Sequence, residues 1–325
     1  QPLNATQNRK LLSLSIVIPC HNEAEVLENT YSTLKKIIGE RLTDKLISDY
    51  EIVLVNNGST DNTLEIMLKL FEFDDKITIV DLRCNSGYQG SISAGLFNTN
   101  NDMVISIDAD LQDDPLKIPE MIEKFYSGYE LVLGIRANRD TDSFFKRHTA
   151  QLFYKLLKLL GVKSVYNHGD FRLMSKNLIN ELKQMPERNR FLRSMIFEIE
   201  SKYACVYYNR VERKVGTSKF NFMALISLAL DGITSFSSVP IRLVFFLGVI
   251  LFLSSMLGLV FVLYIKFAIG ARIPGWASMS VFILFFSGLQ NLSIGLLGEY
   301  ISKIYIEIKR RPIYSIRRVY KKESI

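Results

Sequence analysis

The segment IDADLQDDP combines side chains that bind divalent cations with a position directly after an apolar stretch. Asp108 and Asp110 are separated by one residue, and Gln112 offers a further oxygen. Hard oxygen ligands of this kind hold Mg²⁺ or Mn²⁺, and such an ion neutralises the negative charge of a diphosphate. Surface turns are also rich in Asp, so an isolated Asp-x-Asp pair has little weight. Its position at the end of a buried strand predicts a site for a metal and a phosphorylated ligand.

The elements that position these residues alternate between apolar strands and helical segments. Strands are predicted at 12–19, 50–55, 77–82, 103–107 and 130–133, and helices at 23–38, 61–73, 89–98 and after Pro115. This alternation predicts an α/β fold with a mostly parallel sheet and helices on both faces.

Residues that could bind a ligand or take part in catalysis follow every predicted strand. Ligands of parallel α/β sheets bind beyond the carboxyl ends of the strands, so these residues are expected to share one site. The groups are Cys20 to Glu23, Asn56 to Ser59, Arg83 to Gly87, Asp108 to Gln112 and Gly134 to Arg136.

Two apolar runs near the carboxyl terminus predict two transmembrane helices. Residues 243–265 and 276–298 contain no charged side chain, and about 20 apolar residues span a bilayer core. Residues 219–238 predict either an amphipathic helix on the membrane surface or a core helix. The predicted organisation is a cytosolic catalytic domain at 1–218, an interface helix at 219–240, two transmembrane helices at 241–300 and a basic cytosolic tail at 301–325.

The net charge of +7 is concentrated beside these apolar runs rather than on a nucleic-acid-binding pattern. Positive residues that flank a span stay in the cytoplasm, so both termini are predicted to be cytoplasmic. The distribution favours a lipid bilayer as partner and argues against nucleic acid. The flanking residues are Arg242, Lys309, Arg310, Arg311, Arg317, Arg318, Lys321 and Lys322.

Several ordered motifs resemble the family 2 glycosyltransferases that act on polyprenyl phosphates, a group that includes bactoprenol glucosyltransferases and dolichol-phosphate mannose synthases. The motifs are LSIVIPCHNE, VNNGSTDNT, IDADLQDDP and NHGDFRLMS, and GLLGEYISKIYIEIKRRP resembles the bactoprenol branch. The resemblance covers about residues 13–312. It implies a GT-A-type fold and metal-dependent inverting transfer of a sugar to polyprenyl (undecaprenyl) phosphate at the cytosolic face of a bacterial inner membrane. It also implies UDP-glucose as donor, with GDP-mannose and modified sugars open, and a possible homotetramer.

The resemblance assigns roles to matching positions. The metal and diphosphate would be bound by Asp108, Asp110 and Gln112. Asn57 stands where the family usually has an acidic residue, and Tyr88 stands where relatives often carry Lys. The implied nucleotide-sugar residues are Pro19, Asn22, Glu23, Asn56, Asn57, Asn85, Gly87, Asp108 and Arg213, the last in a segment expected to close over the nucleotide.

Basic residues after the fifth predicted strand are candidates for the acceptor phosphate. The resemblance gives Arg136 this role, with Arg147 as a second contact and Arg139 as a neighbour. Asp170 is the candidate catalytic base. A phosphate acceptor whose second pKa is about 6 is already largely anionic, so Asp170 is alternatively expected to orient the acceptor or hold Arg172.

The sequence bears on three other functions as well. A processive polysaccharide synthase usually carries a Gln-x-x-Arg-Trp motif, whereas the single Trp276 begins an apolar run. A dinucleotide-dependent dehydrogenase is disfavoured because no Gly-x-Gly-x-x-Gly follows the first strand. A catalytically silent membrane scaffold agrees with the departures at Asn57 and Tyr88 but not with the intact metal-binding motif.

Overall fold

The computed structural model describes residues 10–43, 45–137, 165, 167–188, 190–209, 239–264 and 275–322. Arg139, Arg147, Arg213 and nearly all of the predicted interface helix at 219–240 lie outside these residues. Contacts divide the chain into two compact units. The first comprises residues 1–155, 163–220 and 311–325, and the second comprises residues 156–162 and 221–310.

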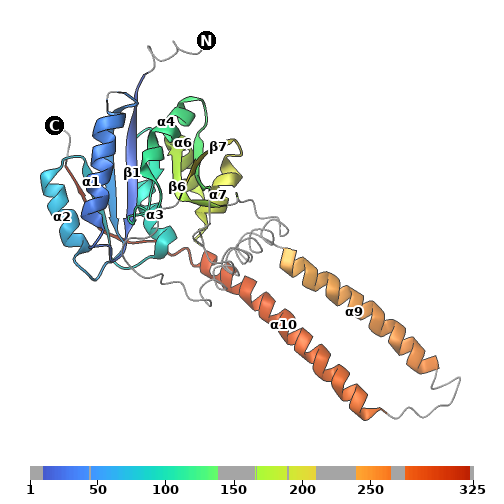
Figure 1. The fold of residues 1–325 in the computed structure, drawn as a ribbon. Helices are drawn as coiled ribbons and strands as arrows, with labels where there is room; N and C mark the ends of the chain where they lie inside the picture. The colour runs from blue at the N-terminus through green and yellow to red at the C-terminus, as the bar shows by residue number, and fades with distance from the viewer. Residues whose placement is uncertain are drawn as a thin grey trace, which may run out of the picture. The chain divides into compact units, whose positions relative to one another are not determined.

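The first unit is organised around one sheet, in which the described residues form eight strands in the order β7-β5-β6-β4-β1-β2-β3-β8 (Figure 1). The strands are β1 (Leu12–Cys20), β2 (Ile47–Asn56), β3 (Ile77–Leu82), β4 (Met103–Ser106), β5 (Leu131–Arg136), β6 (His168–Ser175), β7 (Tyr203–Tyr208) and β8 (Ile316–Lys321). The order places β1 and β4, whose carboxyl ends carry the predicted site, side by side at the centre of the sheet.

The sheet is mixed. β1 pairs in parallel with β2 and β4, β2 with β3, and β5 with β7. β6 runs antiparallel to β4 and β5, and β8 runs antiparallel to β3. Because β6 is inverted, its first residues lie at the same edge as the last residues of β4 and β5, and Asp170 is therefore brought to the predicted site.

Helices cover both faces of the sheet, which confirms the predicted α/β class. They are α1 (Leu27–Ile37), α2 (Thr63–Phe73), α3 (Gly87–Phe97), α4 (Ile118–Tyr126), α6 (Lys176–Gln184) and α7 (Leu192–Ile199). Ile16 and Ile18 share a buried cluster with Leu27 and Leu34 of α1. Val17 points to the opposite face because side chains alternate along a strand. A Cβ at Gly95 of α3 would lie 2.3 Å from Val17 Cγ1, so this glycine lets α3 pack closely against β1.

The second unit contains α9 (Val239–Tyr264) and α10 (Trp276–Ile308). Of the helices that the structure describes, one satisfies the length and composition needed to cross a membrane. This is α9, in which the stretch Ile241–Gly258 has a mean hydropathy of 2.2 and is not buried within the protein. The second predicted transmembrane helix, which falls within α10, stays a prediction.

The carboxyl-terminal segment differs from the expected tail at 301–325. α10 continues to Ile308, and residues 316–321 form β8 against β3. The physical reason lies in the alternation of side chains. Tyr320 packs edge-to-face on Phe71 at a centroid distance of 6.2 Å, while neighbouring basic residues on β8 reach Asp81 and Glu51. Short runs rich in Arg and Lys were interpreted as tail because their charge conceals this pattern.

Candidate active site

The side-chain amide of Asn57 joins the loop that follows β2 to the loop that follows β3. Its Nδ2 donates to Asn85 Oδ1 at 3.2 Å and to the Gly87 carbonyl oxygen at 3.3 Å. Its Oδ1 accepts from the Ser86 amide N–H at 2.9 Å. The side chain is buried, so the amide that the resemblance assigns to nucleotide-sugar binding is bonded at both ends to the β3–α3 loop.

His21, in the loop that follows β1, is linked to the same two loops. Its Nδ1 lies 3.0 Å from the Asn57 carbonyl oxygen, and its Nε2 lies 3.1 Å from Asn85 Nδ2. A carbonyl oxygen only accepts hydrogen bonds, so these partners assign the proton to Nδ1 and leave Nε2 to accept from the Asn85 amide. The imidazole therefore fixes the orientation of Asn85, whose Oδ1 also accepts from the Gly87 amide N–H at 2.9 Å.

Two positions in these loops require unusual backbone conformations. Asn22 has a φ of 56°, and its Oδ1 accepts from the Thr60 amide N–H at 2.8 Å. Asn tolerates the left-handed region better than most residues do. Gly58 has a φ of 62°, and a Cβ there would lie 2.6 Å from Asn85 N, so a side chain is excluded. These positions allow the β1–α1, β2–α2 and β3–α3 loops to approach one another closely.

The remaining residues predicted to bind the nucleotide also lie near the carboxyl ends of the strands. Asn56 Nδ2 donates to Asp81 Oδ1 at 2.7 Å, and both residues are buried. Pro19 is the penultimate residue of β1, and the Glu23 amide N–H donates to Thr63 Oγ1 at 2.9 Å. The structure thus brings together Pro19, Asn22, Glu23, Asn56, Asn57, Asn85 and Gly87, while their contact with a nucleotide stays a prediction.

The Asp108–Gln112 turn follows β4. Leu111 has a φ of 53°, a strained conformation for a branched side chain; such strain costs about 1–3 kcal/mol and is concentrated at functional sites. Asp110 Oδ1 accepts from the Gln112 amide N–H at 3.1 Å. Asp108 Oδ1 accepts from the Tyr88 hydroxyl at 2.7 Å. Tyr88 therefore contacts the predicted metal ligand directly, which the sequence analysis did not foresee.

The electrostatics of this turn suit a cation. Burial, together with the charges of Asp113 and Asp170, raises the pKa of Asp108 to about 7. A raised carboxyl pKa means that the site disfavours the negative charge gathered there. Among the residues that the structure describes, no group of three or more His, Cys, Asp or Glu side chains is arranged to hold a metal ion. The predicted donor set of two Asp and one Gln nevertheless fits Mg²⁺ or Mn²⁺ in its oxygen chemistry.

Arg136 is held at the end of β5 by two side chains. Its Nη2 donates to Asp113 Oδ1 at 3.2 Å, and its Nε donates to the Tyr208 hydroxyl oxygen at 3.3 Å. The Tyr208 hydroxyl also donates to Asp113 Oδ1 at 2.5 Å. Asp113 is 1 % exposed whereas the Arg136 side chain is 19 % exposed, so a partly accessible arginine is held by a buried carboxylate.

Asp170 is bonded to two arginines. Arg172 Nη2 donates to Asp170 Oδ1, and Arg193 donates to Asp170 Oδ2 through Nη2 at 2.6 Å and Nε at 3.2 Å. Burial opposes ionisation of Asp170, but the charges of Arg193 and Arg172 outweigh it and hold the pKa well below its ordinary value. A carboxylate in this state is a poor proton acceptor near neutral pH.

Sequence reasoning missed four residues of this cluster: Tyr88 as a partner of Asp108, and Asp113, Arg193 and Tyr208 altogether. Asp113 lies within the conspicuous motif IDADLQDDP, so an available signal was not used. Arg193 and Tyr208 lie on α7 and β7, which were not predicted.

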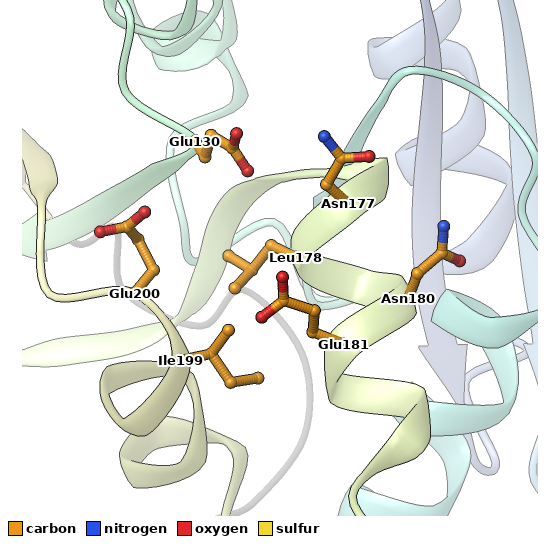
Figure 2. A pocket seen from close by; sticks show the side chains of 7 residues that line it. All are labelled: Glu130, Asn177, Leu178, Asn180, Glu181, Ile199 and Glu200. Carbon is orange, nitrogen blue, oxygen red and sulfur yellow. The ribbon is translucent and has the colours of Figure 1, made fainter.

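A separate cavity of about 390 Å³ is lined by Glu130, Asn177, Leu178, Asn180, Glu181, Ile199 and Glu200 (Figure 2). It lies at the opposite edge of the sheet, because Leu131 pairs with Met174 there while Ile135 pairs with His168 near the candidate site. Three glutamates would repel a nucleotide diphosphate, so this cavity is no alternative active site for such a ligand.

The comparisons with known proteins agree with this geometry. A model of glycosyl transferase family 2 matches residues 15–183. The chain belongs to this family. The match covers β1 to β6 and includes the Asp108–Gln112 turn and Asp170.

The relatives extend the similarity over both units. An uncharacterized glycosyltransferase of Bacillus subtilis, YkoT, is 44% identical over 93% of this chain and 90% of its own length. The bactoprenol glucosyl transferase of Shigella phage SfX is 39% identical, over 94% of this chain and 99% of its own length. A prophage bactoprenol glucosyl transferase homolog of Escherichia coli is also 39% identical, over 95% and 100%. These matches confirm the predicted resemblance.

Among solved structures, glucosyl-3-phosphoglycerate synthase from Mycobacterium tuberculosis, in complex with Mn²⁺, UDP and phosphoglyceric acid, matches at a TM-score of 0.44 and 17% identity. The match covers 68% of this chain and 75% of that protein. A similarity at this level carries no information on the substrate of this chain.

Proposed function

We propose that the protein transfers a sugar, glucose from UDP-glucose, to a polyprenyl phosphate such as undecaprenyl phosphate with inversion at the anomeric carbon. The observation that carries the proposal is the 39% identity to a bactoprenol glucosyl transferase over 94% of this chain. The acid–arginine cluster at the ends of β4, β5 and β6 provides the charges that a reaction between two phosphate-bearing substrates requires.

The donor would be bound by the loops after β1, β2 and β3, with its diphosphate near the Asp108–Gln112 turn. Asp108, Asp110 and Gln112 would hold Mg²⁺ or Mn²⁺, which supplies positive charge for the departing nucleoside diphosphate. The raised pKa of Asp108 supports this assignment, since burial and neighbouring carboxylates create a demand for a cation. Arg213, outside the described residues, is retained as a predicted donor contact.

The acceptor phosphate is assigned to Arg136, whose guanidinium is oriented by Asp113 and Tyr208. Arg147 and Arg139 remain predicted further contacts, outside the described residues. A phosphate oxygen attacks the anomeric carbon from the side opposite the leaving diphosphate. The acceptor monoester is largely anionic at neutral pH because its second pKa is about 6, so the attack needs no strong base.

A lipid substrate agrees with the exposed apolar surface of α9. Phe245, Ile250 and Leu257 on this helix are 66%, 62% and 74% exposed, respectively, an exposure that a bilayer would relieve. We extend the proposal to an integral protein of a bacterial inner membrane, with α9 and α10 as spans and the catalytic unit in the cytoplasm. The predicted interface helix at 219–240 and a homotetramer belong to the same proposal.

The proposal is tested by transfer of radiolabelled sugar from UDP-glucose, GDP-mannose and other nucleotide-sugars to undecaprenyl phosphate, with and without EDTA. We expect label in the lipid phase from UDP-glucose and its loss on chelation. Labelling from another donor would change the sugar that we assign. Labelling unaffected by EDTA would contradict the proposed metal requirement. The absence of label from every donor, with the protein folded and metal present, would contradict the proposed reaction.

A further inference from the structure

Arg317 of β8 contacts the end of β3 at two places. Its Nη1 lies 3.6 Å from Asp81 Oδ2, and its Nη2 donates to the Arg83 carbonyl oxygen at 3.2 Å. The backbone joins the same segments, because the Arg83 amide N–H donates to the Ser315 carbonyl oxygen at 2.8 Å. One guanidinium of the carboxyl-terminal segment therefore binds the residues at which the β3–α3 loop begins.

The register of β8 changes at Arg317. Arg318 pairs with Asp81, but Ile316 pairs with Leu82, so Arg317 is an extra residue in β8 and forms a β-bulge. A bulge changes the direction in which a side chain points, and bulges are frequent beside functional sites. The bulge agrees with the position of the Arg317 side chain, which reaches both Asp81 and the residue after β3.

Asp81 is the buried partner in this contact. Its side chain is 1% exposed, whereas that of Arg317 is 55% exposed. A buried carboxylate stays ionised only when positive charge or hydrogen-bond donors lie close to it. Arg317 supplies the positive charge, and Asn56 Nδ2 donates to the other carboxylate oxygen at 2.7 Å. Asp81 is thus held between the carboxyl-terminal strand and the last residue of β2.

Asn56 connects Asp81 to the loops of the candidate donor site. While its Nδ2 donates to Asp81, its Oδ1 accepts from the Ser59 amide N–H at 3.1 Å. The Ser59 hydroxyl oxygen in turn accepts from the Asn22 amide N–H of the β1–α1 loop, also at 3.1 Å. Asn56 is buried. The orientation of its amide therefore depends on Asp81, and the position of the Ser59 backbone depends on that amide.

The β2–α2 and β3–α3 loops also pack directly on one another. A Cβ at Gly58 would lie 2.6 Å from Asn85 N, so the two backbones are in direct contact. Asn57, beside this glycine, donates to Asn85 Oδ1 and to the Gly87 carbonyl oxygen. Segments packed this closely transmit small displacements. A change at the end of β3 therefore reaches the residues that are predicted to bind the nucleotide.

Lys321 forms a second ion pair of β8, at the opposite end of β3. Its Nζ lies 3.6 Å from Glu51 Oε2, the same distance as in the pair of Arg317 with Asp81. Lys321 pairs with Thr78 at the beginning of β3, whereas the candidate site lies beyond the carboxyl end. The two pairs are alike in length and strand, and they differ in whether the carboxylate binds a side chain of the donor loops.

We propose that Arg317 is a positioning residue of the nucleotide-sugar site, which orients the donor-binding loops through Asp81 and the Arg83 carbonyl group. This role rests on the proposed function for the identity of the ligand, a nucleoside diphosphate bound by the loops after β1, β2 and β3. Because β8 follows α10 in the chain, the strand after the second apolar helix then takes part in donor binding. Covering the edge of the sheet is its second role.

The test measures the affinity of the full chain in detergent micelles for UDP and for GDP, each with Mg²⁺, by calorimetry. The variant is Arg317→Gln, and the matched control is Lys321→Gln, which removes an ion pair of the same length from the same strand. Residues of one hydrogen-bond and ion-pair network are energetically coupled, so we expect Arg317→Gln to weaken binding of the preferred nucleotide about fivefold or more. Lys321→Gln should stay within about twofold of the wild type.

Two further measurements separate positioning from a general loss of structure. Hydrogen exchange at the Ser59 amide reports on its bond to Asn56, and it should be faster in Arg317→Gln but not in Lys321→Gln. The KM for the nucleotide-sugar should rise while the KM for polyprenyl phosphate stays unchanged, since a smaller fraction of folded protein lowers the rate and neither KM. Unchanged nucleotide affinity in Arg317→Gln, or an equal loss in Lys321→Gln, would overturn the proposed role.

If Arg317→Gln does not fold, Arg317→Lys decides, because it keeps the charge beside Asp81 but has no second nitrogen for the Arg83 carbonyl oxygen. We then expect a loss of about threefold in nucleotide affinity, and an affinity equal to that of the wild type would overturn the role. Sugar transfer by the wild type is measured in parallel. Nucleotide binding that depends on Arg317 without any transfer would contradict the proposed function and leave the positioning role intact. Transfer by the wild type with unchanged nucleotide affinity in Arg317→Gln would contradict the positioning role alone.

Discussion

The two halves of the candidate site are built from different kinds of interaction. On the side of β1, β2 and β3, neutral amides and backbone groups satisfy one another around Asn57. On the side of β4, β5 and β6, four aspartates and three arginines meet, and Asp113 Oδ2 and two nitrogens of Arg172 lack hydrogen-bond partners. The first half is a closed network of hydrogen bonds, whereas the second contains buried polar atoms that lack a hydrogen-bond partner. We infer that the first half fixes shape and the second performs the chemistry.

The largest loss of sugar transfer is expected from substitution of a predicted metal ligand in the charged half. Asp110→Asn should lower sugar transfer about 100-fold or more, because a metal at a leaving group contributes several kcal/mol. The measurement is initial rate at saturating Mg²⁺ or Mn²⁺. Asp114→Asn is the matched control, since Asp114 Oδ1 accepts from the Leu116 amide N–H at 3.0 Å and Asn caps equally well. Equal rates for the two variants would remove Asp110 from the metal site.

A smaller loss is expected at the acceptor side. Arg136→Gln should raise the KM for polyprenyl phosphate by roughly 10- to 100-fold, because it removes a charge-assisted contact of about 1.5–3 kcal/mol. Its effect on the KM for the nucleotide-sugar should remain within threefold. Lys176→Gln, at the opposite edge of the sheet, should leave both values unchanged. A rise confined to the KM for the nucleotide-sugar would show that Arg136 contacts the donor and not the acceptor.

Substitutions in the amide half, around Asn57, are expected to lower the stability of the protein. Asn57→Ala leaves the Ser86 N–H and the Asn85 and Gly87 oxygens without their buried partner. The free energy of unfolding should fall by about 1–3 kcal/mol, read as a lower melting temperature. Asn98→Ala removes a single amide bond to Ala94 O at a half-buried helix end, and it should cost less. If Asn98→Ala were as damaging, the loop network would not be a special source of rigidity.

The smallest effect concerns pH. The folded pKa of Asp170 lies well below its ordinary value because Arg193 and Arg172 overcome the effect of burial. The stability that this pairing contributes is therefore fully present above the unfolded pKa of about 4 and is lost only as pH falls through the folded pKa. The difference in stability between wild type and Asp170→Asn should be constant between about pH 7 and pH 5 and shrink below pH 4. A difference that shrinks already at pH 6 would show that Asp170 is not held ionised.

The first half of the catalytic unit was predictable because its signals are local. Each strand from β1 to β4 is an apolar run followed by polar residues, and parallel pairing then brings those residues to one edge. The Asp108–Gln112 turn was found for the same reason. β6, β7, α7 and β8 were not predicted. β6 reads HGDFRLMS and is nevertheless buried throughout, since its polar residues are neutralised by partners that are distant in sequence.

Sequence alone determined which residues end the central strands, that the fold is α/β, and that a long apolar stretch exists at α9. Those features depend on local composition and on the spacing of apolar residues, and both can be read directly from the sequence. Only the tertiary structure determined which side chains each charged residue contacts. It inverted β6, which carries Asp170 to the ends of β4 and β5, and it brought Arg193 of α7 onto that carboxylate across 23 positions of sequence. It also returned β8 to the edge of the sheet beside β3. Such pairings depend on long-range packing, and no local pattern encodes them.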